Sequence, residues 1–217
     1  MKTLKKTYGV GINDATYKLR IVRETLNSSG KRSRILVWEC PYFRKWKAML
    51  GRCYSDKHQK RHPTYIGCSV CDEWLTFSNF KSWMETQDWE GKVLDKDLLI
   101  YQNKIYSPET CVFVDETINL LLGKRTAARG DYPLGVYFYH REGYCKYAGQ
   151  VMYNRRKINT RYFDTPLAAH RHWQLVKSNL VRSLAETETD EKVKSGLFRV
   201  YNKIYNDYCN NIITEDY

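Results

Sequence analysis

Short apolar runs separated by polar turns fill residues 91–122, and the rest of the chain can be arranged around this segment. Val93-Leu94 predicts a strand that ends in the acidic turn Asp95-Lys96-Asp97. A second apolar run at 111–114 predicts another strand. Pro108 lies before that run and excludes a long helix there, because proline has no amide hydrogen to donate and clashes with the preceding helical turn.

A short helix is expected after the second strand. Asp115 is suited to cap its first turn, because an aspartate side chain can accept hydrogen bonds from the amides there. The apolar face of the helix comprises Ile118, Leu121 and Leu122. This order of strand, acidic turn, strand and helix is expected to bring Asp95 close to Asn119. A carboxylate and a neutral oxygen ligand that converge in this way can hold a hard cation such as Mg²⁺.

Two segments further upstream, 43–50 and 77–84, have apolar residues at helical spacing, and the first carries basic residues on its outer side. Three tryptophans are expected to fill the core beside them: Trp74, Trp83 and Trp89. A basic loop is predicted between residues 55 and 63. The candidates for phosphate contacts in the first helix and this loop are Arg44, Lys45, Lys57, Lys60 and Arg61.

A second patterned region follows residue 130. Alternation at 135–140 and 144–151 predicts a hairpin, and 158–163 predicts a third strand. Thr165-Pro166 then begins a helix, because threonine caps a first turn and proline is tolerated in it. Basic side chains and tyrosines on one face of this sheet suit phosphates and base edges. The residues expected on that face are Tyr137, Tyr139, Arg141, Lys146, Arg155, Arg156 and Arg161.

The two ends of the chain leave alternatives open. Residues 1–35 are basic, poor in large aliphatic side chains, and contain a clear turn at Asn27-Ser28-Ser29-Gly30. They form either an arm that lies along DNA or an ordered hairpin packed on the core. Residues 190–208 have a helical pattern, and this helix either extends the second region or makes a dimer contact.

The balance of charge points to a polyanionic partner. The 217 residues include 36 basic and 24 acidic side chains, a net charge of +12. Residues 67–130 carry seven basic and ten acidic groups, whereas the segments on both sides are strongly basic. An acidic centre between basic flanks fits a metal site between phosphate-binding surfaces. Since neither a membrane span nor a signal-peptide core is recognisable, we expect a cytoplasmic protein with no membrane partner.

The cysteines indicate thiols rather than cross-links. Their number is seven, and an odd count argues against a disulfide framework. Cys68 and Cys71 have the spacing of a zinc knuckle, but no second close pair exists to complete a four-thiolate site. The sequence therefore argues against a structural zinc and favours small buried core residues.

Residues 91–122 resemble the ββα-metal core of the HNH endonucleases. In that family an Asp-His pair ends the first strand and an Asn or His lies on the helix. Here Asp95-Lys96 takes the place of the pair, and Asn119 takes that of the helix ligand. Upstream, YFRKWKAMLGRCY, CDEW and FSNFKSWM resemble the free-standing HNH homing endonucleases of bacteriophages. The candidate catalytic residues are Asp95, Lys96, Asp97, Asn103 and Asn119, and the candidate metal ligands are Asp95 and Asn119.

Two positions depart from the HNH pattern. Lys96 stands where the family has its general-base histidine, and Thr110 replaces the asparagine that usually orients that histidine. Because a lysine has an ordinary pKa of about 10.4, it acts as a base only if its surroundings neutralise it. Otherwise it stabilises the charged phosphate while the metal activates water. His58 and His62 are the alternative sources of a base.

The run GVYFYHREGYCKYAGQV followed by YFDTPLAAHRHW resembles the plant ethylene-response-type DNA-binding domain, whose three-stranded sheet enters the major groove. The resemblances together imply an α+β chain with an HNH-like ββα-metal core and flanking helices, followed by a three-stranded antiparallel sheet with a helix. The expected parts are a basic arm or hairpin (1–35), the nuclease core (36–128), the DNA-binding domain (131–184) and a C-terminal helical extension (185–217).

The leading hypothesis is therefore an endonuclease of the phage HNH homing type. It would use Mg²⁺ or another divalent cation to hydrolyse phosphodiester bonds in double-stranded DNA at a recognised site. The alternative, which Lys96 favours, is a DNA-binding or regulatory protein with an altered HNH-like core and no nuclease activity. A third hypothesis is an RNA-binding module, because tyrosine-rich basic surfaces also stack on single strands.

Overall fold

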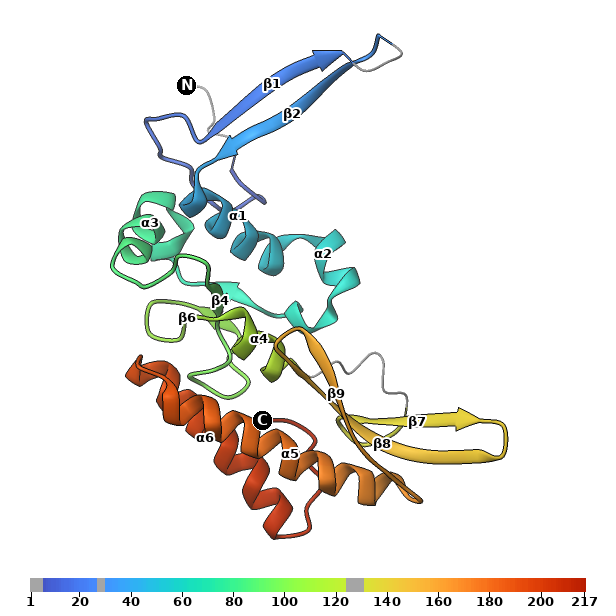
Figure 1. Ribbon diagram of the computed structural model, residues 1–217. Coiled ribbons are helices and arrows are strands. Elements are labelled where there is room, and N and C mark those ends of the chain that lie inside the picture. Colours follow the sequence, from blue (N-terminus) through green and yellow to red (C-terminus); the bar gives the residue numbers. More distant parts are fainter. Residues whose placement is uncertain (1–5, 27–29, 124–130) are drawn as a thin grey trace. The chain divides into compact units, whose positions relative to one another are not determined.

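The computed structural model of the protein describes residues 6–26, 30–123 and 131–217 (Figure 1). The turn expected at Asn27-Ser28-Ser29 and the domain boundary expected between 128 and 131 lie outside these residues. The chain folds into two compact units of mixed helix and strand. The first unit comprises residues 1–90 and 102–111, and the second comprises 91–101 and 112–217, so the chain passes between the units three times.

Two helices, α1 (Pro41–Tyr54) and α3 (Phe77–Glu85), form the centre of the first unit and confirm the helical patterns seen in the sequence. Aromatic side chains fill the space beside them. Trp46 donates its indole N–H to the carbonyl oxygen of Trp74 at 2.7 Å, and the Trp74 ring meets Phe80 edge-on with centroids 5.1 Å apart. The tryptophans expected in this core are buried or half-buried: Trp74, Trp83 and Trp89.

The prediction of a loop at residues 55–63 is wrong, because most of this segment is the helix α2 (Asp56–Arg61). The Ser55 hydroxyl accepts a hydrogen bond from the amide of His58 at 3.4 Å and so caps the first turn. An acidic residue in the first turn and basic residues in the last also favour the helix dipole. The remaining short elements are η1 (Pro63–Tyr65), β3 (Ser69–Val70), η2 (Glu73–Leu75) and β5 (Ile105–Tyr106), which pairs parallel with β3.

The N-terminal segment packs on α1 near its start and continues into an exposed hairpin. A Cβ added to Gly11 would stand 2.9 Å from the Trp46 ring, so the chain passes directly over α1 at this glycine. β1 (Arg20–Leu26) and β2 (Arg32–Glu39) then pair antiparallel. The hairpin is not packed on the core along its length, since large apolar side chains on it are exposed: Ile21, Val22, Leu26, Ile35, Leu36, Val37 and Trp38.

The second unit begins with the strand–strand–helix order that the sequence predicts. β4 (Val93–Asp95) pairs antiparallel with β6 (Val112–Val114), and α4 (Glu116–Leu122) lies against β4. Asp115 is the residue before the helix, as expected, but its side chain makes no capping hydrogen bond. Ile118 is buried in the core of this unit, which confirms the expected apolar face.

The expected three-stranded antiparallel sheet is present in the same unit. It consists of β7 (Val136–Arg141), β8 (Tyr144–Tyr153) and β9 (Arg156–Phe163), with β8 in the middle. The helix α5 (Pro166–Thr187) covers one face of the sheet, and α6 (Glu191–Cys209) packs along α5 (Figure 1). The C-terminal helix therefore extends the sheet domain.

Glycines bring α5 unusually close to the sheet. A Cβ on Gly135 would collide with the Trp173 ring on α5, and a Cβ on Gly149 would come within 2.7 Å of the same side chain, so no larger residue fits at either position. The helix starts as expected, because the Thr165 hydroxyl accepts a hydrogen bond from the amide of Ala168 at 3.2 Å. Thr165 thus specifies where α5 starts, and the two glycines specify the sheet face that α5 can approach.

Candidate metal centre and nucleic-acid interface

The two candidate metal ligands lie in one ββα element of the second unit. Asp95 is the last residue of β4 and pairs with Val112, the first residue of β6. Asn119 is in the middle of α4, the helix that lies against β4. Strand pairing and helix packing therefore connect the elements that carry these two side chains.

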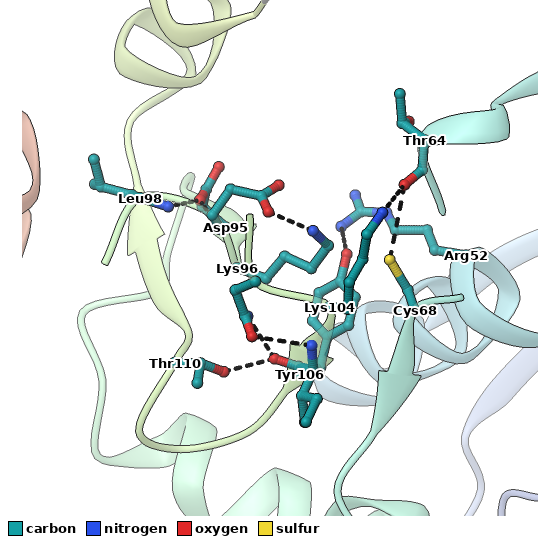
Figure 2. A network of polar contacts seen from close by, with 12 residues as sticks. Arg52, Thr64, Cys68, Asp95, Lys96, Leu98, Lys104, Tyr106 and Thr110 are labelled. Atoms are coloured by element: carbon teal, nitrogen blue, oxygen red, sulfur yellow. Dashed lines mark hydrogen bonds and ion pairs between the residues drawn. The ribbon is translucent and has the colours of Figure 1, made fainter. Parts of the chain in front are cut away.

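The Asp95 carboxylate organises the acidic turn that follows it. Its Oδ1 accepts hydrogen bonds from the amides of Asp97 and Leu98, each at 2.8 Å, and Figure 2 shows the second of these. No hydrogen bond to Oδ2 is found within the described residues. Burial raises the pKa of Asp95, and the charge of Asp97 adds to this effect against the opposing amide bonds and Lys96. A partly desolvated carboxylate with one oxygen left over fits a divalent cation, which would favour its charged form.

Lys96 is buried, with only 5% of its surface exposed. Its Nζ lies 2.5 Å from Oδ1 of Asp97, whose side chain is more than half exposed. This is the contact of an ammonium donor with a carboxylate acceptor. The turn therefore fixes two carboxylates and one amine within three consecutive residues.

Helix α6 holds the acidic turn, a relationship that no local pattern in the sequence indicates. The Arg199 Nη2 donates to the carbonyl oxygens of Asp97 and Leu98 at 3.2 and 3.1 Å. A Cβ on Gly196 would stand 2.6 Å from Cγ of Leu98, so the helix meets the turn closely at a residue without a side chain. These contacts join positions about one hundred residues apart, beyond the range of a periodicity argument.

The start of α4 is tied to the turn between β8 and β9. In that turn Asn154 and Arg155 have φ angles of 47° and 60°, as in the tight hairpin turns that match the twist of a sheet. Arg155 forms an ion pair with Glu116, and the Thr117 hydroxyl donates to Oδ1 of Asn154 at 3.1 Å. The structure thus gives Arg155, expected to contact DNA, an intramolecular partner on α4.

Contacts with α5 and with Tyr217 hold the end of α4. Lys177, a buried residue of α5, donates to the carbonyl oxygen of Leu121, and the Tyr217 hydroxyl donates to that of Leu122 at 3.1 Å. The last carbonyls of a helix have no partners within it, and a cation there interacts favourably with the helix dipole. Both ends of the helix that carries Asn119 are therefore anchored to the sheet domain.

Asn103 and Thr110 belong to the first unit and make local hydrogen bonds there. The Asn103 amide donates to the carbonyl oxygen of Ile105 at 2.7 Å and accepts from its amide at 3.1 Å. The Thr110 hydroxyl also donates to that carbonyl, at 2.7 Å. Both side chains stabilise a turn, and a catalytic role for Asn103 stays a prediction.

The basic side chains around α1 and α2 differ in exposure. Those that are exposed to solvent are Arg44, Lys57, Lys60 and Arg61. Lys45 is half-buried, and burial, followed by the charges of Arg44 and Arg52, lowers its pKa. The exposed set forms the phosphate-contact candidates of the first unit.

The two candidate histidines stack on each other, with the ring centroids of His58 and His62 4.7 Å apart. His58 Nε2 is buried without a hydrogen-bond partner in the described part of the chain. Burial lowers the pKa of His58, and the charges of His62 and Arg52 act in the same direction, so its imidazole is neutral at pH 7. A neutral imidazole can accept a proton, but a role as the base for Asp95 and Lys96 stays a prediction.

Cys68 and Cys71 are both free thiols. Cys68 is buried with its Sγ 3.9 Å from the carbonyl oxygen of Thr64, as Figure 2 shows, and burial raises the pKa of Cys71. Over the described ranges, no group of three or more His, Cys, Asp or Glu side chains lies close enough together to hold a metal ion. Asparagine is not among these residue types, so this absence does not bear on Asp95 with Asn119.

The sheet has an exposed face opposite α5. The strand register places Tyr139 beside Lys146 and Arg141 beside Tyr144, so these four side chains share a face, together with Tyr137. This agrees with the expected placement of the β7 and β8 residues. Three of the tyrosines on this face form a cluster with ring centroids 5.1–6.1 Å apart: Tyr139, Tyr144 and Tyr162.

One basic residue of β9 is displaced from its expected face. Arg156 pairs with Tyr153, which packs against the hydrophobic core, so Arg156 lies on the α5 side of the sheet. Lys157, which pairs with Met152, takes the outward place instead. A shift of one residue reverses the face because side chains alternate along a strand. Arg161 remains exposed beside the irregularity in β9.

Comparisons with protein-family models, with curated proteins and with solved structures gave no significant match. Within the described ranges, none of the helices combines the length and apolar character needed to cross a membrane.

Proposed function

We propose that the protein is a divalent-metal-dependent endonuclease that acts on double-stranded DNA. The observation that supports this best is the ββα element, in which Asp95 ends β4 with one carboxylate oxygen left over and Asn119 lies on the adjacent α4. The basic, tyrosine-bearing sheet face belongs to the same compact unit. A metal site and a DNA-binding surface in the same unit would suit site-directed hydrolysis of a phosphodiester.

The residues fit a hard cation in number and kind. Asp95 and Asn119 would hold Mg²⁺ through oxygen atoms, and a site with two protein ligands suits an ion that keeps several waters and binds phosphate oxygens. The bound ion would neutralise the phosphate and make water a better nucleophile. The Asp95 Oδ1 remains engaged by two backbone amides, which orients the carboxylate.

Lys96 acts in this proposal as a fixed positive charge. Its Nζ is held by Asp97, a contact that suits the ammonium form. A buried ammonium beside the scissile phosphate would stabilise the negative charge that develops in the transition state without having to reorganise.

A DNA-binding protein without nuclease activity is the second candidate. The observation that favours it is again Lys96, which is buried and engaged by Asp97 where a nuclease of this type has a histidine base. In this case the second unit would bind DNA through the same sheet face and leave the backbone intact.

The test is nicking of supercoiled plasmid and of phage and host DNA by the parent protein and by Asp95→Ala, with Mg²⁺ or with EDTA. We expect Mg²⁺-dependent nicking by the parent, a loss of about 10²-fold or more in the variant, and DNA affinities within a few-fold. Asp72→Ala, which changes an exposed aspartate of the first unit, is the matched control and should cut like the parent. Binding without cleavage by the parent would instead support the second candidate.

A further inference from the structure

We propose that Arg199 is a positioning residue for the acidic turn Asp95-Lys96-Asp97, and this inference rests on the proposed nuclease function. Arg199 is on α6, outside the ββα element. Across the described residues, it forms no hydrogen bond with either candidate metal ligand. It acts on the turn through the backbone of Asp97 and Leu98.

Hydrogen bonds hold both the amides and the carbonyl oxygens of Asp97 and Leu98. The amides of Asp97 and Leu98 both donate to Oδ1 of Asp95, and their carbonyl oxygens both accept from Nη2 of Arg199. Asp95 and Arg199 therefore hold the same two residues by opposite ends of their backbone. If the guanidinium is removed, the two carbonyls lose their donor, and the amides that orient the Asp95 carboxylate are no longer fixed.

Packing supports the same role. Leu98 is buried and lies against Gly196, one turn before Arg199 on α6. Arg199 itself is half-buried, with its guanidinium 6.0 Å from the ring centroid of Tyr101. The side chain is thus held by neighbours on the segment that it anchors. A single guanidinium nitrogen can satisfy two successive carbonyls here because α6 meets the turn so closely.

The expected consequence is a loss of catalytic geometry without a loss of DNA binding. A displacement of about 1 Å in a catalytic group can reduce the rate by about 10²-fold. The Arg199→Met variant retains most of the aliphatic packing and removes the donors. We expect it to bind DNA like the parent, to cut about 10²-fold more slowly, and to require a higher Mg²⁺ concentration for half-maximal rate.

Arg171 provides a matched control in the same unit. Its Nη2 also donates to a backbone carbonyl, that of Tyr208 at 3.2 Å, and its guanidinium lies 5.0 Å from the Tyr208 ring centroid. Arg171→Met therefore removes a comparable set of contacts away from the acidic turn. It should leave the Mg²⁺ dependence of cleavage unchanged. Arg199→Lys, which restores a donor, should recover part of the rate.

Hydrogen exchange at the Asp97 and Leu98 amides gives a measurement that does not depend on activity. In the full-length protein, Arg199→Met should exchange these amides at least about ten times faster than the parent, because the bonds to Asp95 open more readily. Arg171→Met should not. Unchanged exchange and unchanged Mg²⁺ dependence in Arg199→Met would overturn the positioning role, as would equal effects of both substitutions.

The two proposals fail in different ways. If the parent does not cleave DNA but the exchange effect is specific to Arg199→Met, the nuclease function fails and the anchoring of the turn stands. If the parent cleaves and Arg199→Met cleaves with the same rate and Mg²⁺ requirement, the nuclease function stands and the positioning role fails.

Discussion

At the scale of single residues, the acidic turn places charge where burial makes charge costly. The carboxylate of Asp95 is partly desolvated, and Lys96 is almost fully covered. Desolvation of an ionised group opposes folding unless partners compensate for it. Groups that serve a function are typically kept at such a cost to stability. Here one oxygen of the Asp95 carboxylate could still bind a ligand.

The substitution Asp95→Asn tests this cost. Asparagine keeps an oxygen to accept the two amide bonds but carries no charge. Because the folded-state pKa of Asp95 is raised, the folded protein is penalised once the pH rises above the pKa of the unfolded chain. We therefore expect Asp95→Asn to have an equal or higher free energy of unfolding at pH 7–8 in EDTA, with the difference disappearing at low pH.

Denaturant titrations of the parent and the variant at several pH values measure this difference. A variant less stable than the parent at pH 8 would contradict it. The same variant should lose Mg²⁺-dependent cleavage, because a neutral amide is a weaker ligand than a carboxylate for a hard cation.

Substitutions at Lys96 separate its possible roles. If the ammonium acts electrostatically, Lys96→Ala should reduce the nicking rate by about 10²-fold or more, and Lys96→Arg should keep part of the activity because its charge is retained. If Lys96 is a neutral base, both variants should be equally inactive. Full activity in Lys96→Ala would place the base outside this turn, and His58 and His62 would be tested next.

At the scale of elements, α4 is a seven-residue helix that relies on its neighbours. A helix this short is not stable alone in water, and Asp115 does not cap it through its side chain. Its ends are fixed instead by contacts with the β8–β9 turn, with α5 and with Tyr217. Local sequence predicts where α4 starts and which face it buries, but not these anchors.

Replacing Tyr217 by phenylalanine removes one anchor and keeps the ring. The carbonyl oxygen of Leu122 loses its donor, so we expect Tyr217→Phe to lower the free energy of unfolding by about 1 kcal/mol. Tyr205→Phe, at an exposed position on α6, is the control and should change little. Thermal unfolding followed by circular dichroism compares them. Equal stability of Tyr217→Phe and the parent would show that the hydroxyl does not hold α4.

The sequence predicts strands and helices well where the apolar pattern is strong. It fails where a residue's contacts lie far away along the chain. The three strands of the sheet and the start of α5 follow from alternation and from Thr165-Pro166. The apolar pattern does not predict α2, because this helix consists of polar and charged residues without apolar positions at helical spacing. Alternation alone places Arg156 one position out of register and so on the wrong face of the sheet. The pattern does not predict the contacts of Arg199 either, because its partners are distant in the chain. The metal ligands are suggested through the resemblance, and their function stays a proposal.

At the scale of the whole molecule, the sheet domain depends on segments that follow it in the sequence. His170 and Gln174 on α5 are fully buried, and their hydrogen-bond partners include Thr214. A fragment that ends at residue 184 would remove this partner from both buried polar groups, which is costly. DNA binding is therefore best measured with the full chain.

The outward sheet face should set the salt dependence of DNA binding. We expect the triple variant Arg141→Gln, Lys146→Gln and Lys157→Gln to flatten the slope of log affinity against log salt by about 0.9 for each phosphate that the protein no longer neutralises. The control replaces Arg182, Lys192 and Lys194 on α5 and α6 by glutamine and removes the same charge elsewhere. Fluorescence anisotropy with duplex DNA measures both slopes. Equal slopes for the two triple variants would remove the sheet face from the interface.

The three passages of the chain between the two units affect how the protein is made. β4 leaves the ribosome before β6, and both leave it long before Arg199, the α6 residue that holds the turn after β4. A nascent chain therefore carries Asp95 without a formed site until about one hundred further residues have been added. A product terminated early, by a nonsense codon or a frameshift before α6, would contain every proposed metal ligand and still lack the support that orders them.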